Sequence, residues 1–100
     1  MNPENFNAYY TRGHSYADIG EHHKAIQDYG IAIKLKPDDD KAYCKRGISY
    51  AQLGEDHKAI QDFDNAIKLK PDDDAYCFRG IYYIQLGESY KAIQDFTTAV

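Results

Sequence analysis

Apolar and small residues recur along this chain at the spacing of one face of an α-helix. The first occurrence is Tyr9, Gly13, Tyr16 and Ile19, at positions i, i+4, i+7 and i+10 of a single helical stripe. The stripe returns twice, at Tyr43, Gly47, Tyr50 and Leu53 and at Tyr76, Gly80, Tyr83 and Leu86. Glycine inside a helix costs roughly 1 kcal/mol relative to alanine. Its return at one place in every copy predicts that a second helix approaches closely there.

A second apolar stripe follows each of the first. Gly20, Gly54 and Gly87 are expected to end the first helices in the left-handed conformation that glycine adopts readily. The second stripes occupy positions i, i+1, i+4, i+7 and i+8. They consist of Ala25, Ile26, Tyr29, Ala32 and Ile33, then Ala59, Ile60, Phe63, Ala66 and Ile67, then Ala92, Ile93, Phe96, Ala99 and Val100. The pattern predicts an all-α chain of about six helices, arranged as antiparallel helix pairs.

The chain also repeats its own text. The eighteen residues His57–Asp74 match His23–Asp40 at all but three positions, and a shorter copy starts at Tyr90, 33 residues after His57. Self-similarity at such a period is typical of solenoids, in which each unit covers the apolar face of its neighbour. We expect one domain over residues 1–100, with units at 6–39, 40–73 and an incomplete 74–100. Residues 1–5 resemble the tail of a preceding unit, as if cut from a longer array.

Polar residues at the expected helix ends agree with this arrangement. Asn2 is the candidate N-cap of the first helix, with Pro3 in its first turn. Pro37 and Pro71 are expected to stop the second helices, because proline cannot continue a helix. The acidic triplets at 38–40 and 72–74 are then placed to cap the next first helices.

One residue is missing from the turn before the third unit. Pro37 to Gly47 spans ten steps along the chain, whereas Pro71 to Gly80 spans nine. Turns tolerate deletions better than helices do, so all three hairpins are expected to form. The rotation between units two and three is expected to differ from that between units one and two.

The units resemble tetratricopeptide repeats. That family's series of aromatic, glycine, aromatic, alanine, aromatic, alanine and proline is matched by Tyr9, Gly13, Tyr16, Ala25, Tyr29, Ala32 and Pro37, by Tyr43, Gly47, Tyr50, Ala59, Phe63, Ala66 and Pro71, and by Tyr76, Gly80, Tyr83, Ala92, Phe96 and Ala99. The chain departs from the family at Arg12, Arg46 and Arg79, where leucine usually precedes the glycine, and it has tyrosine where tryptophan is frequent. The resemblance implies a right-handed superhelical α-solenoid whose first helices line a concave groove, and a role in holding peptides or proteins.

The resemblance also implies which residues face that groove. They lie six, three and two positions before each first-helix glycine, and one, four and five positions after it. These positions hold Asn7, Tyr10, Thr11, His14, Ala17 and Asp18, then Lys41, Cys44, Lys45, Ile48, Ala51 and Gln52, then Asp74, Cys77, Phe78, Ile81, Ile84 and Gln85. Some family members clamp an acidic peptide C-terminus with a lysine and an asparagine from this set. This chain has neither residue at the corresponding places.

The composition of the groove favours an apolar or amphipathic ligand segment. Its apolar members are Tyr10, Ile48, Phe78, Ile81 and Ile84, which suit the docking of an amphipathic helix. Packing between adjacent first helices accounts for Ile48 and Ile81 equally well. Both explanations stand at this point.

Charge and motifs argue against several other functions. A formal net charge of −4, with lysine and arginine spread among acidic residues, argues against nucleic acid as a partner. No apolar run reaches the ~20 residues needed to cross a bilayer, and the cytoplasm is the expected compartment of a chain without an export signal. Cys44 and Cys77 occupy equivalent places in adjacent units and are expected to be free thiols.

No enzymatic chemistry is expected. The chain lacks nucleophile, phosphate-loop and dinucleotide motifs, and six of its ten tyrosines lie on the first-helix stripes, where core packing explains them. Its four histidines lack metal-ligand spacing and fit solvated turns, so no metal or cofactor is expected: His14, His22, His23 and His57.

Two functions remain open. The first is a protein-interaction module that binds a peptide or protein in the groove. The second is a structural, self-assembling fragment of a longer solenoid. In the third unit Ile93, Phe96 and Val100 lie on the edge that a following unit would cover, so weak homo-oligomerisation through that edge is expected.

Overall fold

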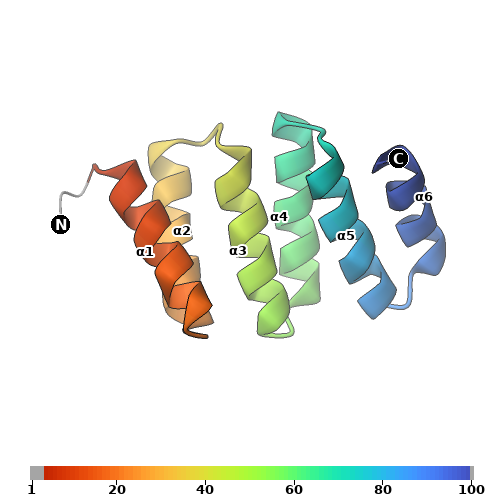
Figure 1. Cartoon of the computed structure of the whole chain (residues 1–100), viewed down its shortest axis with the longest axis horizontal. Coiled ribbons are helices and arrows are strands. Elements are labelled where there is room, and N and C mark those ends of the chain that lie inside the picture. The colour runs from red at the N-terminus through yellow and green to blue at the C-terminus, as the bar shows by residue number, and fades with distance from the viewer. Residues whose placement is uncertain (1–3, 100) are drawn as a thin grey trace.

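The computed structural model describes residues 4–99, which contain six α-helices and no strand (Figure 1). The helices are α1 (Phe6–Asp18), α2 (His22–Leu35), α3 (Asp40–Gln52), α4 (Asp56–Leu69), α5 (Asp73–Gln85) and α6 (Ser89–Ala99). They form the hairpins α1–α2, α3–α4 and α5–α6, arranged side by side along the 44 Å length of the molecule. The first helices α1, α3 and α5 also contact one another in that order. The predicted all-α solenoid is confirmed.

The first helix of each hairpin begins at a side-chain cap. The Ala8 N–H donates to Asn5 Oδ1 at 3.0 Å, so Asn5 is the N-cap of α1. The prediction that Asn2 caps this helix was wrong, because the helix begins only at Phe6; Asn2 and Pro3 lie outside the described residues. The carboxylates of Asp39 and Asp72 accept in the same way at the starts of α3 and α5. Acidic caps were predicted at both places and are confirmed.

Two kinds of glycine shape each hairpin. Gly20, Gly54 and Gly87 have φ angles of 83°, 79° and 77°, so the predicted left-handed stops are confirmed. Gly47 has a different role, since a Cβ atom there would lie 3.1 Å from the Phe63 ring and 3.2 Å from a carbonyl oxygen of α4. Equivalent contacts occur at the first-helix glycines of the other hairpins. The close approach of a second helix, predicted from sequence, is confirmed.

An arginine–aspartate pair joins the two helices of every hairpin. Arg46 Nε and one terminal nitrogen donate to the two carboxylate oxygens of Asp62, each at 2.8 Å. Two more such pairs lie at the equivalent positions: Arg12 with Asp28, and Arg79 with Asp95. The aspartates are at most 3% exposed, and a buried carboxylate is stable only when it is paired and hydrogen-bonded. We call each pair a fork.

Tyrosines flank the arginine of each fork. The Arg46 guanidinium carbon lies 5.8 Å from the ring centroids of both Tyr43 and Tyr50. Arg12 and Arg79 are flanked by tyrosines in the same way, at 5.6–5.8 Å. These distances are within the range of cation–π attraction. The six tyrosines are half-buried, and Tyr50 packs against the core cluster as expected, so they combine core packing with this contact to arginine.

The core lies between the two helices of each hairpin and between successive hairpins. Ala25, Tyr29, Ala59 and Phe63 are at most 1% exposed, as the second apolar stripes predict. The first stripe is not buried to its end, because α1 stops at Asp18 and the following C-cap residue, Ile19, is 73% exposed. The one-residue deletion falls in the turn between α4 and α5, and both flanking helices are intact, as expected.

Candidate functional site

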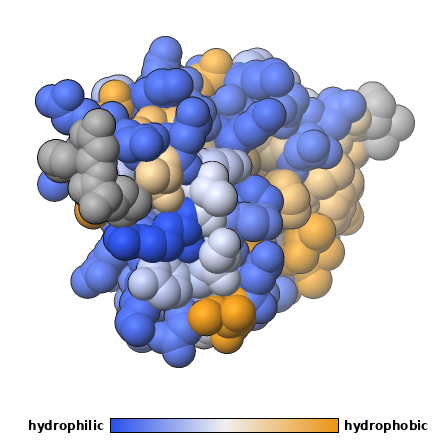
Figure 2. All heavy atoms as spheres, turned by 60° about the vertical axis from the view of Figure 1, so that its left-hand side comes forward, coloured by the Kyte–Doolittle hydropathy of each residue, from blue (hydrophilic) through white to orange (hydrophobic). Residues whose placement is uncertain are grey.

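The groove is the face formed by α1, α3 and α5. Of the residues predicted to face it, ten are exposed: Asn7, Thr11, His14, Asp18, Lys41, Gln52, Asp74, Ile81, Ile84 and Gln85. The other eight are half-buried: Tyr10, Ala17, Cys44, Lys45, Ile48, Ala51, Cys77 and Phe78. Figure 2, which brings the α1–α2 end forward, shows mainly hydrophilic atoms there and hydrophobic atoms gathered toward the right of the view.

Several half-buried groove residues belong to the core. Tyr10 stacks on Phe6 and meets the edge of Tyr29. Ile48 packs against the cluster built around Phe63, so the packing explanation holds for it. Ile81 is 45% exposed on α5, so the same explanation does not account for it. The exposed apolar part of the groove is therefore concentrated on α5.

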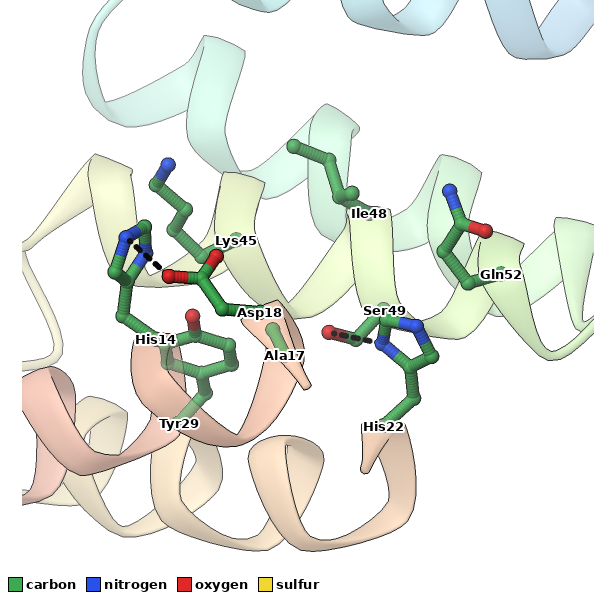
Figure 3. Close-up of a pocket in the computed structure, with 9 residues that line it drawn as sticks. All are labelled: His14, Ala17, Asp18, His22, Tyr29, Lys45, Ile48, Ser49 and Gln52. Carbon is green, nitrogen blue, oxygen red and sulfur yellow. Dashed lines mark hydrogen bonds and ion pairs between the residues drawn. The ribbon is translucent and has the colours of Figure 1, made fainter. Parts of the chain in front are cut away.

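A pocket of about 310 Å³ opens between α1, α2 and α3 (Figure 3). Six of the residues around it were predicted as groove residues, and His22, Tyr29 and Ser49 were not. The lining consists of His14, Ala17, Asp18, His22, Tyr29, Lys45, Ile48, Ser49 and Gln52. We call this space the α1–α3 pocket. Helices α1 and α3 form its sides, and the second helix α2 closes it from below.

A buried phenol lies at the base of the α1–α3 pocket. Tyr29 is 1% exposed, and its hydroxyl group points up between the two first helices (Figure 3). Burial, helped by nearby Tyr10 and Asp18, raises the pKa of Tyr29 to about 12. Residues 4–99 contain no fully buried side-chain nitrogen or oxygen atom that lacks a hydrogen-bond partner, and no hydrogen bond of this hydroxyl is seen, so the hydroxyl reaches the open space of the pocket. It is available to a bound group.

Polar side chains surround this phenol. His22 Nδ1 lies 3.4 Å from Ser49 Oγ across the pocket, and His14 Nε2 lies 3.6 Å from Asp18. His22 had been expected to be a solvated turn residue. That was wrong, because it lies in the first turn of α2 and is half-buried against α3. The α1–α3 pocket thus combines an aromatic base with donors and acceptors on its walls.

A second, smaller space of about 230 Å³ lies between the N-terminal parts of α3 and α5. Asp40, Lys41, Cys44, Lys45, Asp72, Asp74 and Phe78 line it. Burial, together with Asp40 and other acidic neighbours, raises the pKa of the Cys44 thiol to about 12. Cys44 and Cys77 are both free thiols, as expected.

Residues 4–99 contain no group of three His, Cys, Asp or Glu side chains placed to hold a metal ion. No helix in that range is long and apolar enough to span a membrane. At the clamp positions the structure has Tyr10 and His14, then Cys44 and Ile48, then Cys77 and Ile81, none of them a lysine or an asparagine.

One face of α6 carries two exposed apolar side chains. Tyr90 is 92% exposed and Ile93 is 60% exposed. Ile26 and Ile60 occupy the equivalent places on α2 and α4 and are half-buried. Phe96 is half-buried against Gly80 of α5, and Val100 lies outside the described residues.

Family models match along most of the chain. A model described as "TPR repeat" matches residues 13–54, and two described as "Tetratricopeptide repeat" match residues 40–73 and 74–100. None of the curated proteins gives a significant match.

Solved structures are similar over nearly the whole chain. A crystal structure of MamA has a TM-score of 0.94 and 32% identity over 98% of this chain, which spans 58% of the MamA chain. The TPR domain of Arabidopsis OM64 has a TM-score of 0.91 and 27% identity, with 99% of this chain and 83% of that chain covered. The second TPR of Spaghetti (RPAP3), bound to the HSP90 peptide SRMEEVD, has a TM-score of 0.90 and 25% identity, with 98% and 92% covered.

Proposed function

Because this chain belongs to the tetratricopeptide repeat family, we propose that it is a protein-interaction module whose groove on α1, α3 and α5 binds a peptide segment of a partner. The observation that supports this most directly is the pair of pockets between successive first helices, lined mainly by groove residues. The likeness to a TPR domain that holds a peptide agrees with it.

The chemistry of the groove points to an amphipathic ligand rather than an acidic C-terminus. Ile81 and Ile84 are 45% and 54% exposed on α5 and offer apolar contact area. The pocket beside Phe78 is lined by three aspartates and two lysines, so its net negative charge would disfavour a carboxylate. Apolar anchors with a polar rim suit a segment that presents one apolar face.

The test combines peptide selection with matched groove variants. Peptides selected from a displayed random library should bind at least tenfold more weakly to Phe78→Ala or Ile84→Ala. A control variant, Gln61→Ala, changes an exposed residue on α4 and should leave binding unchanged. Selected peptides that bind all variants equally would place the binding surface elsewhere and refute the proposal.

The absence of the clamp gives a separate measurement. The peptide SRMEEVD with a free C-terminal carboxylate should bind this chain no better than its amidated form. Calorimetry with both forms measures the difference. A marked loss of affinity on amidation would contradict the proposed ligand class.

We propose weak self-association through α6 as a second candidate function, because Ile93 is 60% exposed where its equivalents are half-buried. The partner is a second copy meeting α6 with its own α6. The opposite end is a poor partner, since Thr11 and Ser15 are exposed polar residues on α1. Two apolar faces are then covered at once.

Light scattering over a hundredfold concentration range measures this association. The mass should rise with concentration, and Ile93→Lys should abolish the rise. Gln94→Lys adds the same charge at a neighbouring exposed position and should not. A constant monomer mass for the unchanged chain would refute this second candidate.

A further inference from the structure

The contact between α2 and α3, here the first joint, differs from the equivalent contact between α4 and α5, the second joint. At the second joint the ring of Phe63 is covered by two aromatic residues of α5. Its centroid lies 6.0 Å from Phe78 and 5.3 Å from Tyr82, with interplanar angles of 15° and 8°. Both are stacked arrangements, which add to the stabilisation that burial provides.

The first joint also has an aromatic ring on its second helix, but it lacks the two rings that cover it at the second joint. Tyr29 lies 34 residues before Phe63 and occupies the same place in its hairpin. The equivalents of Phe78 and Tyr82, 33 residues earlier, are Lys45 and Ser49. Both of them line the α1–α3 pocket. The pocket is therefore the space that aromatic side chains of the chain itself fill at the next joint.

We propose that the α1–α3 pocket binds the side chain of a tyrosine presented by the groove ligand, with its ring over Tyr29 and its hydroxyl group toward His22. The second joint provides the internal precedent, since Tyr82 lies over Phe63 there, and Asp56 stands where His22 stands at the first joint. This inference rests on the proposed peptide-binding function and names the residue that the groove selects.

Size and polarity fit a phenol. A cavity of about 150 Å³ accepts benzene in a protein core, and this pocket measures about 310 Å³. An aliphatic side chain would displace water from the Tyr29 hydroxyl and from His22 without replacing the hydrogen bonds of that water, and such a loss is costly. A phenol offers both a face to stack and a hydroxyl that donates and accepts.

The charges around the pocket favour a neutral ring over an ionised group. Lys45 and Asp18 carry opposite charges on facing walls, and His14 lies beside Asp18. Gln52 adds an uncharged amide at the rim. No single sign dominates, so neither a carboxylate nor a cation has a clear electrostatic advantage there.

The direct test uses p-cresol, which reproduces the tyrosine side chain, and toluene, which lacks the hydroxyl. Amide chemical shifts of the chain should saturate with p-cresol around His22 and Ser49 and respond less to toluene. Ser49→Tyr places the residue of the second joint into the pocket, and it should abolish both responses. An absence of saturable p-cresol shifts, or their persistence in Ser49→Tyr, would overturn the proposal.

His22→Ala tests the chemistry of the pocket without blocking it. His22 is half-buried in the first turn of α2, and alanine is a good helix former, so the variant should fold. Losing one hydrogen bond should reduce the preference for p-cresol over toluene by about three- to tenfold. An unchanged preference would show that His22 does not bind the hydroxyl group of the ligand and would overturn the proposed orientation.

Selected peptides separate this inference from the proposed function. If they lose affinity in Phe78→Ala but not in Ser49→Tyr, and p-cresol does not bind, the groove function stands and the tyrosine site is refuted. If p-cresol binds as expected but no groove peptide is selected, the groove function fails and the phenol site stands. Full support requires tyrosine-containing peptides that Ser49→Tyr weakens at least tenfold and that Gln61→Ala leaves unchanged.

Discussion

The two joints of this solenoid are built from nearly the same text but differ in what covers the central ring. At the second joint Phe78 and Tyr82 close over Phe63, while at the first joint Lys45 and Ser49 leave Tyr29 under an open pocket. Hairpin formation is the same on both sides, with equivalent glycines and forks. The difference shows that the fork within a hairpin and the cover between hairpins depend on different residues of one first helix.

An extra ion pair also distinguishes the second joint. Arg79 bonds to Asp95 within its hairpin and also to Asp64 of α4, at 2.8 Å. Gly30 occupies the position of Asp64 at the first joint, so Arg46 has no such partner there. The turn before α5 is one residue shorter as well, and we still expect the rotation between hairpins to differ at the two joints.

Removing the arginine of a fork should have the largest effect on stability. Arg79→Met leaves the buried Asp95 unpaired and also loses Asp64, so the free energy of unfolding should fall by about 3–5 kcal/mol. Arg46→Met should cost somewhat less, since it loses only Asp62. Urea denaturation measures both. Combining Arg79→Met with Asp95→Leu should recover most of the loss, and failure to recover would argue against an unpaired carboxylate as the cause.

Removing a covering ring from the second joint should have the next largest effect on stability. Tyr82→Ser introduces the residue of the first joint and removes a ring that is 9% exposed. Large-to-small substitutions of buried aromatic residues cost about 3–5 kcal/mol, and we expect about 3 because Phe78 remains over Phe63. Thermal unfolding followed by circular dichroism measures it. If Tyr82→Ser proves nearly neutral, the covering ring is not what distinguishes the joints.

Alkaline pH should destabilise the chain at the first joint only, since Tyr29 can ionise and Phe63 cannot. Burial raises the pKa of Tyr29 from 10.0 to about 12. The unfolded chain therefore loses this proton first, and stability falls as pH rises from about 10 toward 12. At pH 11 the destabilisation should be about 1 kcal/mol, because one pKa unit corresponds to 1.36 kcal/mol. Urea denaturation of the unchanged chain and Tyr29→Phe at pH 8 and 11 measures the difference. An identical pH dependence in both would contradict the burial of this hydroxyl.

The smallest predicted effect comes from giving the first joint the extra ion pair that the second joint has. A Cβ atom at Gly30 would lie 3.7 Å from a terminal nitrogen of Arg46, which is an ordinary contact distance. Gly30→Asp should therefore stabilise the chain by about 0.5–1 kcal/mol, partly through helix propensity and partly through a partly exposed ion pair. Gly30→Ala isolates the propensity term. Equal gains in both variants would mean that the new carboxylate does not reach Arg46.

The fold could be predicted from sequence because its signals are local and repeated. The apolar stripes, the stops at Gly20, Gly54 and Gly87, and the acidic caps each depend on neighbours within a few residues. The repeat then supplied the long-range arrangement, since each unit must cover the next. The N-cap of α1 was predicted at Asn2 and lies at Asn5, because the sequence alone does not show where the first helical turn begins.

The candidate site was less accessible because it depends on pairs that are distant in sequence. The forks join residues sixteen positions apart on facing helices. A signal for them existed, since arginine precedes each first-helix glycine and aspartate returns at one place in every second helix. The α1–α3 pocket arises from two substitutions, Lys45 and Ser49, whose effect depends on what lies beneath them. Only the packed structure shows that Ser49, the position equivalent to Tyr82, lines the same pocket as Tyr29.

The fork gives this chain a property that matters for design. Because Arg46 and Asp62 hold their hairpin together from within, the face that α3 turns toward α2 can change without unlocking the hairpin. On the proposed phenol site, placing the residues of 78 and 82 at 45 and 49 would close the recess at the first joint, and the reverse exchange would open one at the second. In an array of such hairpins, each contact between neighbours would then hold a pocket that is either open to an aromatic side chain of a partner or filled by an aromatic side chain of the array itself.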